Sequence, residues 1–281
     1  MSTVVFAHHK GGTGKTTSCL NIAGFLQKSG EKVLVVDIDP QANATSGLGI
    51  NPDSLSKNIY DVFMNVFEGF PDVNMRDIIV KTDSGIDLAP SSLDLVGVEP
   101  YLYNIDDRIN VLREALKPIT QKYDHVLIDT PPSMGQFVLN GLVAADRTIV
   151  TLDSGFFALK GVDALNMIFD DIRENVGRNV SADLAIITKN RIDDEKNRSF
   201  FDGILASLKS FLNTDSDEIK DRERILKNEE EVKKLFRQVF SIPYDLQIYE
   251  AQQHGMPVSH YAPTGRAARA YCEIADIVKK W

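Results

Sequence analysis

Residues 8–17, with the sequence His-His-Lys-Gly-Gly-Thr-Gly-Lys-Thr-Thr, have the side-chain types and spacing of a phosphate-binding turn. Glycines let backbone N–H groups point at phosphate oxygens, and a helix that begins directly after them adds the positive end of its dipole. Lys15 is expected to reach the β- and γ-phosphates of a nucleotide, and the Thr16 hydroxyl to bind Mg²⁺. The expected nucleotide contacts of this turn are Gly11, Gly12, Thr13, Gly14, Lys15, Thr16 and Thr17.

The turn differs from an ordinary P-loop at two positions. The pattern G-x-x-x-x-G-K-[ST] has glycine where this chain has His9. A second lysine, Lys10, stands directly before the glycines. The resulting K-G-G-x-G-K-T resembles the deviant Walker A signature of the ParA/MinD class of P-loop ATPases. This resemblance implies an ATP-dependent homodimer in which Lys10 reaches the ATP bound by the partner, so that both Lys10 and Lys15 take part in catalysis.

Three aspartates are expected beside the phosphates, because ligands of parallel α/β sheets bind outside the carboxyl ends of the strands. Asp37 and Asp39 follow one apolar run and Asp129 ends another. Phosphoryl transfer needs Mg²⁺ on the phosphates, a carboxylate behind the metal and a group that orients the attacking water. Asp129 resembles the Walker B carboxylate, and Asp39 the residue that positions and activates the water. Thr16, Asp39 and Asp129 form the expected Mg²⁺ site, which Asp37 supports.

Alternating strands and helices must position these residues. Apolar runs predict strands at residues 3–7, 32–39, 85–89, 123–129, 147–152, 184–188 and 239–243. Helical spacing predicts helices at residues 16–29, 55–66, 75–80, 106–117, 136–145, 160–176, 199–212 and 265–280, with a loop at 41–49. The alternation predicts an α/β fold with a doubly wound, mostly parallel sheet flanked by helices, as in P-loop NTPases. We expect one domain over residues 1–281, with a charged helical excursion or loop at about 213–231.

Composition narrows the class of protein. The 281 residues are 43% hydrophobic and carry a formal net charge of −9, which argues against strong, uniform binding to nucleic acid or anionic membranes. No run of about 18 apolar residues occurs, so no membrane insertion is expected. Cys19 and Cys272 are isolated and are expected to be reduced packing residues. We therefore expect a cytoplasmic protein, associated with the nucleoid if it binds DNA.

Three further blocks resemble the chromosomal ParA (Soj) branch of partition ATPases. Residues 35–45 are similar to its second signature, and residues 123–133 to its Walker B block. Ile242-Pro243 and the residues up to Tyr261 are similar to its closing block. The resemblance implies ATP and Mg²⁺ as cofactors and a ParB-like or other stimulating protein as partner. It also places Asn190 near the adenine and Pro243 over the base.

The residues at the expected DNA-binding surface differ from those of the Soj branch. Tyr244 and Gln247 stand where the Soj branch has arginines that contact DNA. Four scattered arginines offer a replacement basic patch: Arg191, Arg198, Arg266 and Arg269. Non-specific DNA binding and its absence both stay open at this point.

Other protein families with the same predicted fold are alternatives. One is a MinD-like positioning ATPase with protein or membrane cargo, but a membrane form needs a basic amphipathic tail, and the chain stops at Trp281 within a predicted packed helix. Another is an ATP-dependent amide- or ring-forming synthetase; those with a glutaminase need a catalytic cysteine, which neither cysteine position favours. A nitrogenase-type reductase needs mid-chain cysteines for its cluster, and there are none. The sequence favours a ParA-like ATPase that drives DNA partitioning or positions cargo.

Overall fold

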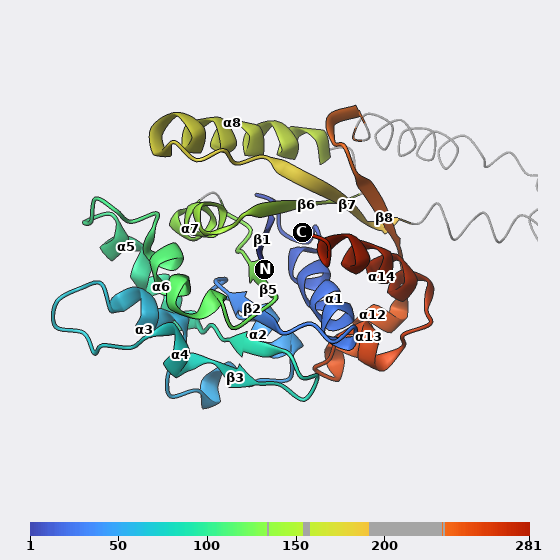
Figure 1. Cartoon of the computed structure of the whole chain (residues 1–281), viewed down its shortest axis with the longest axis horizontal. Coiled ribbons are helices and arrows are strands. Elements are labelled where there is room, and N and C mark those ends of the chain that lie inside the picture. The colour runs from blue at the N-terminus through green and yellow to red at the C-terminus, as the bar shows by residue number, and fades with distance from the viewer. Residues whose placement is uncertain (134, 154–157, 191–231, 233) are drawn as a thin grey trace, which may run out of the picture.

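An eight-stranded sheet with helices on both faces organises the computed structural model, which describes residues 1–133, 135–153, 158–190, 232 and 234–281 (Figure 1). The strands are β1 (Ser2–Ala7), β2 (Val33–Asp37), β3 (Val80–Lys81), β4 (Asp87–Ala89), β5 (His125–Asp129), β6 (Arg147–Asp153), β7 (Ala182–Asn190) and β8 (Val239–Pro243). Their order is β3-β4-β2-β5-β1-β6-β7-β8, and all neighbouring pairs are parallel except β3 with β4. The predicted doubly wound, mostly parallel α/β sheet is confirmed.

Helices cover this sheet in two groups. The longer ones are α1 (Lys15–Lys28), α6 (Val111–Thr120), α7 (Gln136–Ala144), α8 (Ala158–Val176), α12 (Leu246–Gln253) and α14 (Arg266–Val278). Shorter helical turns are α2 (Asn43–Gly47), η1 (Pro52–Ser54), α3 (Ile59–Met64), α4 (Met75–Ile78), η2 (Leu93–Val98), α5 (Glu99–Leu102) and α13 (Val258–Tyr261). Beside strands β6 to β8, α8 lies on one side of the sheet, and α1 and α14 on the other (Figure 1). The buried residues of α7 belong to the same core layer as those of α8.

The core is divided by the sheet into two layers. On β1, Val5 and Ala7 join the layer under α3, α6, α7 and α8, whereas Val4 and Phe6 join the layer under α1 and α14. Alternation of side chains along a strand places successive residues on opposite faces, and both faces are buried here. This explains why the strands are continuous apolar runs, and why their carboxyl ends are held rigidly enough to position a site.

The prediction of a loop at residues 41–49 is wrong, because Asn43–Gly47 form helix α2. The turn begins after Ala42, whose φ of 51° is left-handed, and its small polar residues gave no helical periodicity. The helix predicted at 75–80 ends at Ile78, and Val80 and Lys81 pair with β4 instead. The predicted helix 55–66 is shorter, because Asn58 caps α3 through the Tyr60 N–H (2.9 Å).

The largest omission of the sequence prediction is the pair α12 and α13, between β8 and α14. Asp245 caps α12 by accepting a hydrogen bond from the Gln247 N–H (3.0 Å), which is the local signal that sequence reasoning missed. The predicted helix at 199–212, the charged segment at 213–231, Arg191 and Arg198 lie outside the described residues. Within the described part of the chain, no helix has the length and apolar character needed to cross a bilayer.

Candidate nucleotide-binding site

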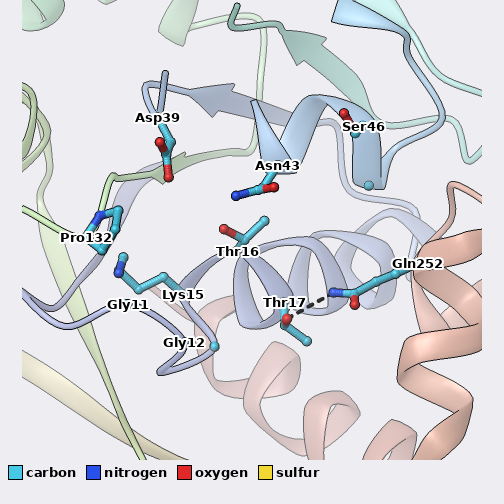
Figure 2. A pocket seen from close by; sticks show the side chains of 12 residues that line it. Gly11, Gly12, Lys15, Thr16, Thr17, Asp39, Asn43, Ser46, Pro132 and Gln252 are labelled. Carbon is cyan, nitrogen blue, oxygen red and sulfur yellow. Dashed lines mark hydrogen bonds between the residues drawn. The ribbon is translucent and has the colours of Figure 1, made fainter. Parts of the chain in front are cut away.

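The glycine-rich turn between β1 and α1 forms one wall of a cavity of about 420 Å³ (Figure 2). Gly12 and Gly14 have φ angles of 76° and 85°, a left-handed conformation that glycine adopts without strain. Gly14 directly precedes the first turn of α1, so the free N–H groups of that turn face the cavity. The lining residues are Gly11, Gly12, Gly14, Lys15, Thr16, Thr17, Asp39, Asn43, Ser46, Gly47, Pro132 and Gln252. The structure thus brings Asp39 and the predicted turn residues except Thr13, which is buried beneath the turn, to one cavity.

Two threonines at the ends of neighbouring strands hold the turn in this shape. The Thr13 hydroxyl lies 3.0 Å from the Thr151 hydroxyl of β6, and the Thr188 hydroxyl of β7 donates to the Thr13 carbonyl (2.9 Å). A methyl group on Gly14 would lie 2.8 Å from the Thr188 Cγ2 atom. Sequence reasoning missed Thr151 and Thr188, because their contact with the turn is made only by the fold.

The two lysines of the turn have different surroundings. Lys15 is 6% exposed, and its Nζ donates to the Lys10 carbonyl (3.3 Å). Burial lowers the pKa of Lys15, while the charges of Asp129 and Asp39 oppose that shift. The Lys10 side chain is 41% exposed, and its Nζ is paired with the carboxylate of Asp153 at the end of β6. Lys15 therefore belongs to the interior of the site, and Lys10 to its outer rim.

Asp37 and Asp129 end two adjacent strands and are direct partners in the β2–β5 register. Both are fully buried. Asp37 accepts hydrogen bonds from the backbone N–H and the hydroxyl of Thr45 (2.8 Å each) and from the Asp39 N–H (3.1 Å). It therefore shapes the turn that carries Asp39, which agrees with the supporting role predicted for it. Asp39 itself lines the cavity and accepts from the Gln41 N–H (2.9 Å).

Burial dominates the ionisation of these carboxyls. It raises the pKa of Asp37 to about 7, against the hydrogen bonds from Thr45 and Asp39 that favour the charged form. Burial also raises the pKa of Asp39, and burial followed by the charge of Asp37 raises that of Asp129. Lys15 is the ammonium that acts on both Asp39 and Asp129. Lys15 thus faces two carboxyls, Asp39 and Asp129, in a buried place.

The donor set fits Mg²⁺. The Thr16 hydroxyl donates to Asp129 Oδ2 (2.6 Å), which turns its oxygen lone pairs away from the carboxylate. The second oxygen, Asp129 Oδ1, is buried and has no hydrogen-bond partner among the residues that the structure describes. Hard oxygen donors and excess negative charge are what Mg²⁺ takes from a protein, with phosphates and waters completing its shell. Thr16, Asp39 and Asp129 are thus brought together as predicted, with Asp129 behind the Thr16 hydroxyl.

A second cavity of about 480 Å³ adjoins the first. Its lining includes Ile242 and Pro243 at the end of β8, Tyr249 on α12 and the buried ring of Tyr271 on α14. Pro243, predicted to cover the base, therefore lies on an apolar cavity next to the glycine turn. The backbone of Asn190, at the end of β7, pairs with Pro243 in the sheet. A contact of Asn190 with the adenine stays a prediction.

The surface around α12 and the start of α14 carries the residues predicted to decide DNA binding. Tyr244 and Gln247 are both exposed, as are Arg266 and Arg269 in the first turn of α14. Leu246, in the first turn of α12, is also exposed (60%). The described part of this surface therefore mixes two arginines with aromatic and aliphatic side chains.

Comparisons with known proteins agree with this geometry. A family model described as "AAA domain" matches residues 1–182. Sporulation initiation inhibitor protein Soj of Bacillus subtilis is 32% identical over 280 residues, which cover 98% of this chain and 97% of Soj.

Solved structures extend the comparison to the fold. Cobyrinic acid a,c-diamide synthase from Mycobacterium smegmatis, with bound ATP analogue and magnesium, has a TM-score of 0.75 at 26% identity, covering 100% of this chain and 96% of the synthase. Septum site-determining protein MinD from Pyrococcus horikoshii, complexed with Mg-ADP, has a TM-score of 0.69 at 21% identity, covering 99% of this chain and 96% of MinD. The likeness to MinD is one of fold alone. Together with the site, the family model and the full-length match to Soj establish that the chain belongs to the AAA-domain family and, within it, to the ParA/Soj branch of P-loop ATPases.

Proposed function

We propose that this chain binds Mg²⁺-ATP, dimerises around it and hydrolyses it to drive DNA partitioning or the positioning of cargo. The observation that carries the proposal is the pair of lysines on one glycine turn: Lys15 lines the cavity, and the partly exposed Lys10 pairs with Asp153. The chromosome-partitioning ATPase Soj of Thermus thermophilus supports a partition role, because it is 32% identical over 275 residues that cover 98% of this chain and 94% of that protein. The ATP analogue and magnesium bound to the synthase support the choice of cofactors, since its fold covers the whole of this chain.

Binding begins at the start of α1. The N–H groups around Gly12 and Gly14 and the dipole of α1 bind the phosphates, and the Lys15 ammonium neutralises the β- and γ-phosphate oxygens. The Thr16 hydroxyl, oriented by Asp129, is the protein ligand that holds the metal. Bound Mg²⁺ supplies Lewis-acid neutralisation of the charge on the β- and γ-phosphates.

Hydrolysis requires a water in line with the γ-phosphate, and Asp39 is the group that orients it and accepts its proton. Burial raises the pKa of Asp39, which makes the carboxylate a better base than an exposed aspartate. The Asp39 carboxylate is fixed by the Gln41 N–H and its loop by Asp37, so it does not need to reorganise for each turnover.

Lys10 supplies the link between hydrolysis and dimerisation. Its ammonium is paired with Asp153 in the isolated chain, and we assign it to the γ-phosphate of the partner in the dimer. A cation delivered in trans stabilises charge that develops as the phosphoryl group leaves, which is the role of a finger residue. Hydrolysis is thereby delayed until two loaded chains meet.

Two kinds of binding partner are candidates for the surface around α12 and the start of α14. Arg266 and Arg269 favour phosphate contacts with non-specific DNA, doubled when two chains dimerise. The exposed Tyr244 and Leu246 favour a protein partner instead, since aromatic and aliphatic side chains are typical of protein interfaces. We propose DNA as the first candidate and a stimulating or cargo protein on the Tyr244 side as the second.

The test of the dimer uses light scattering after size exclusion with Mg²⁺-ATP. Wild type is expected to reach twice the 31.3 kDa chain mass, whereas Lys10→Ala stays at one chain mass and still binds nucleotide. Lys32→Ala is the matched control, because Lys32 is exposed and precedes the amino end of β2, whereas the glycine turn follows the carboxyl end of the parallel strand β1. An unchanged dimer of Lys10→Ala would refute the assignment of Lys10.

The test of the cargo is sedimentation of the protein with DNA in low salt. Retention with ATP and little retention with ADP is expected, and the Arg266→Ala/Arg269→Ala double variant should weaken it without changing basal hydrolysis. With few cations and a net charge of −9, the salt dependence should be shallow. Equal retention with ADP, or none with ATP, would reject DNA and favour the protein partner.

A further inference from the structure

The cavity beside the glycine turn and the apolar cavity beside β8 share three lining residues, Gly14, Thr17 and Gln252. Gly14 and Thr17 belong to the start of α1, whereas Gln252 comes from α12, 235 residues further along the chain than Thr17. Gln252 is therefore the side chain with which α12 closes the junction between the two cavities. Neither the motif analysis nor the proposed mechanism gives this residue a role.

The amide of Gln252 is held in a defined orientation. Its Nε2 donates to the Thr17 hydroxyl at 3.0 Å (Figure 2). Within the described part of the chain, its carbonyl oxygen Oε1 accepts no hydrogen bond, and the residue is only half-buried. A glutamine that uses its donor on the protein still offers an acceptor to a ligand.

The segment that carries Gln252 is packed tightly on α1. Asn21 of α1 accepts a hydrogen bond from the backbone N–H of Val258 (2.7 Å), next to the start of α13. Gly24 lets this segment approach, because a methyl group there would lie 2.2 Å from Ser259 Oγ and 2.6 Å from Pro257 Cβ. Gln252 thus lies on a part of the chain that is fixed to the phosphate-binding helix, which suits a residue that must be preorganised for a ligand.

We infer that Gln252 recognises the sugar of the bound nucleotide, with Oε1 accepting a hydrogen bond from a ribose hydroxyl. In a nucleoside triphosphate the sugar lies between the phosphates and the base. With phosphates in the first cavity and the base in the second, the sugar must lie at the junction that Gln252 closes. The inference rests on the proposed binding of ATP at this site, and it makes the site selective for ribonucleotides over at least one deoxy analogue.

The experiment measures the affinities of ATP, 2′-deoxy-ATP and 3′-deoxy-ATP for the full chain by calorimetry with Mg²⁺. Wild type is expected to bind one deoxy analogue about 2- to 12-fold more weakly than ATP, the range for one neutral hydrogen bond. Gln252→Met, of similar length but without hydrogen-bonding groups, should bind ATP as weakly as that analogue. Gln253→Met is the matched control, because this neighbour is exposed on the same helix and lines neither cavity.

Gln252→Glu separates the sugar contact from packing. Its carboxylate still accepts from a ribose hydroxyl and from the Thr17 hydroxyl, so it should keep the preference for ATP even if its charge weakens all three nucleotides. Equal binding of all three nucleotides by wild type, or an unchanged preference in Gln252→Met, would overturn the inference. Absence of ATP binding by wild type would instead overturn the proposed function, which distinguishes the two failures.

Discussion

Replacing Asp37 by asparagine is expected to change the way in which the stability of the nucleotide-free protein depends on pH. Asp37 is fully buried at the end of β2, and burial raises its pKa to about 7 from 3.8. Between these two values the folded chain holds a proton on Asp37 that the unfolded chain has released. The free energy of unfolding therefore falls as the pH rises through this window, because the unfolded state binds fewer protons.

The size of the effect follows from the width of the window. Within this window the free energy of unfolding falls by about 1.4 kcal/mol for each pH unit. Between pH 5 and 7 the raised pKa of Asp37 therefore lowers it by about 3 kcal/mol. His8 acts in the opposite direction, since burial lowers its pKa to about 4 and its neutral form stabilises the fold as the pH rises from 4 towards 6.5. Because His8 is present in both proteins, its contribution cancels in the difference between Asp37→Asn and wild type.

Urea unfolding at pH 5, 6, 7 and 8 with a chelator measures this difference. The stability of Asp37→Asn relative to wild type should rise by about 3 kcal/mol from pH 5 to 8, on top of a constant loss from weaker bonding to Thr45. Asp53→Asn, at an exposed aspartate, should show no such rise. Mg²⁺-ATP should flatten the wild-type profile, since a bound cation favours the ionised carboxylates. A difference between Asp37→Asn and wild type that does not change with pH would refute the account of a buried, protonated Asp37.

The other predictions concern nucleotide binding and turnover. Lys15→Ala should bind ATP about 10- to 100-fold more weakly by calorimetry, because charge-assisted bonds are worth about 1.5–3 kcal/mol each; near-normal affinity would remove Lys15 from the phosphate site. Asp39→Ala should bind ATP and dimerise while its steady-state hydrolysis falls at least about 100-fold, and turnover within a few-fold of wild type would assign the water to another group. Gly14→Ala should lose ATP affinity, because its methyl group meets Thr188 in addition to the strain of a φ of 85°. Gly30→Ala, with a φ of 91° and no close neighbour, should lose about 1 kcal/mol of stability but no ATP affinity.

The sheet could be predicted from the sequence because both of its faces are buried. Runs such as residues 33–36 are apolar at successive positions, and a strand covered on both faces needs this pattern. The limits of the strands were less well predicted, since β7 extends to residues 182–190 although only 184–188 form the apolar run. Its ends are set by pairing with β6 and β8, which the sequence of β7 alone does not contain.

Short helices were missed for a different physical reason. Helix α2 has five residues and α13 has four, too few for an apolar periodicity to show. Their positions depend on distant parts of the chain: Thr45 in α2 bonds to Asp37, and α13 packs against Gly24. Elements of this kind are stabilised by tertiary contacts rather than by propensity.

In the candidate site too, residues within one stretch of sequence could be predicted, whereas residues brought in by distant elements could not. The residues from Lys10 to Thr17 are contiguous, so their chemistry could be predicted from one stretch of sequence. Asp129 could be predicted because it ends an apolar strand. Thr188 and Gln252 could not, because each reaches the turn through one contact made between elements far apart in the chain.

Helix α1 connects the phosphate end of the site to the carboxyl-terminal helices by direct packing. Its first turn binds phosphate in the proposed mechanism, while further along Ser18 lies 3.2 Å from the buried hydroxyl of Tyr271 in α14. Gly24 leaves no space between α1 and the residues around Ser259, so neither element can shift without the other. If nucleotide binding displaces α1, helices α12 and α14 are therefore expected to move with it. Helix α12 begins two residues after Tyr244, and α14 carries the exposed Arg266 and Arg269. In this arrangement the proposed cargo surface would respond to the nucleotide through these packing contacts.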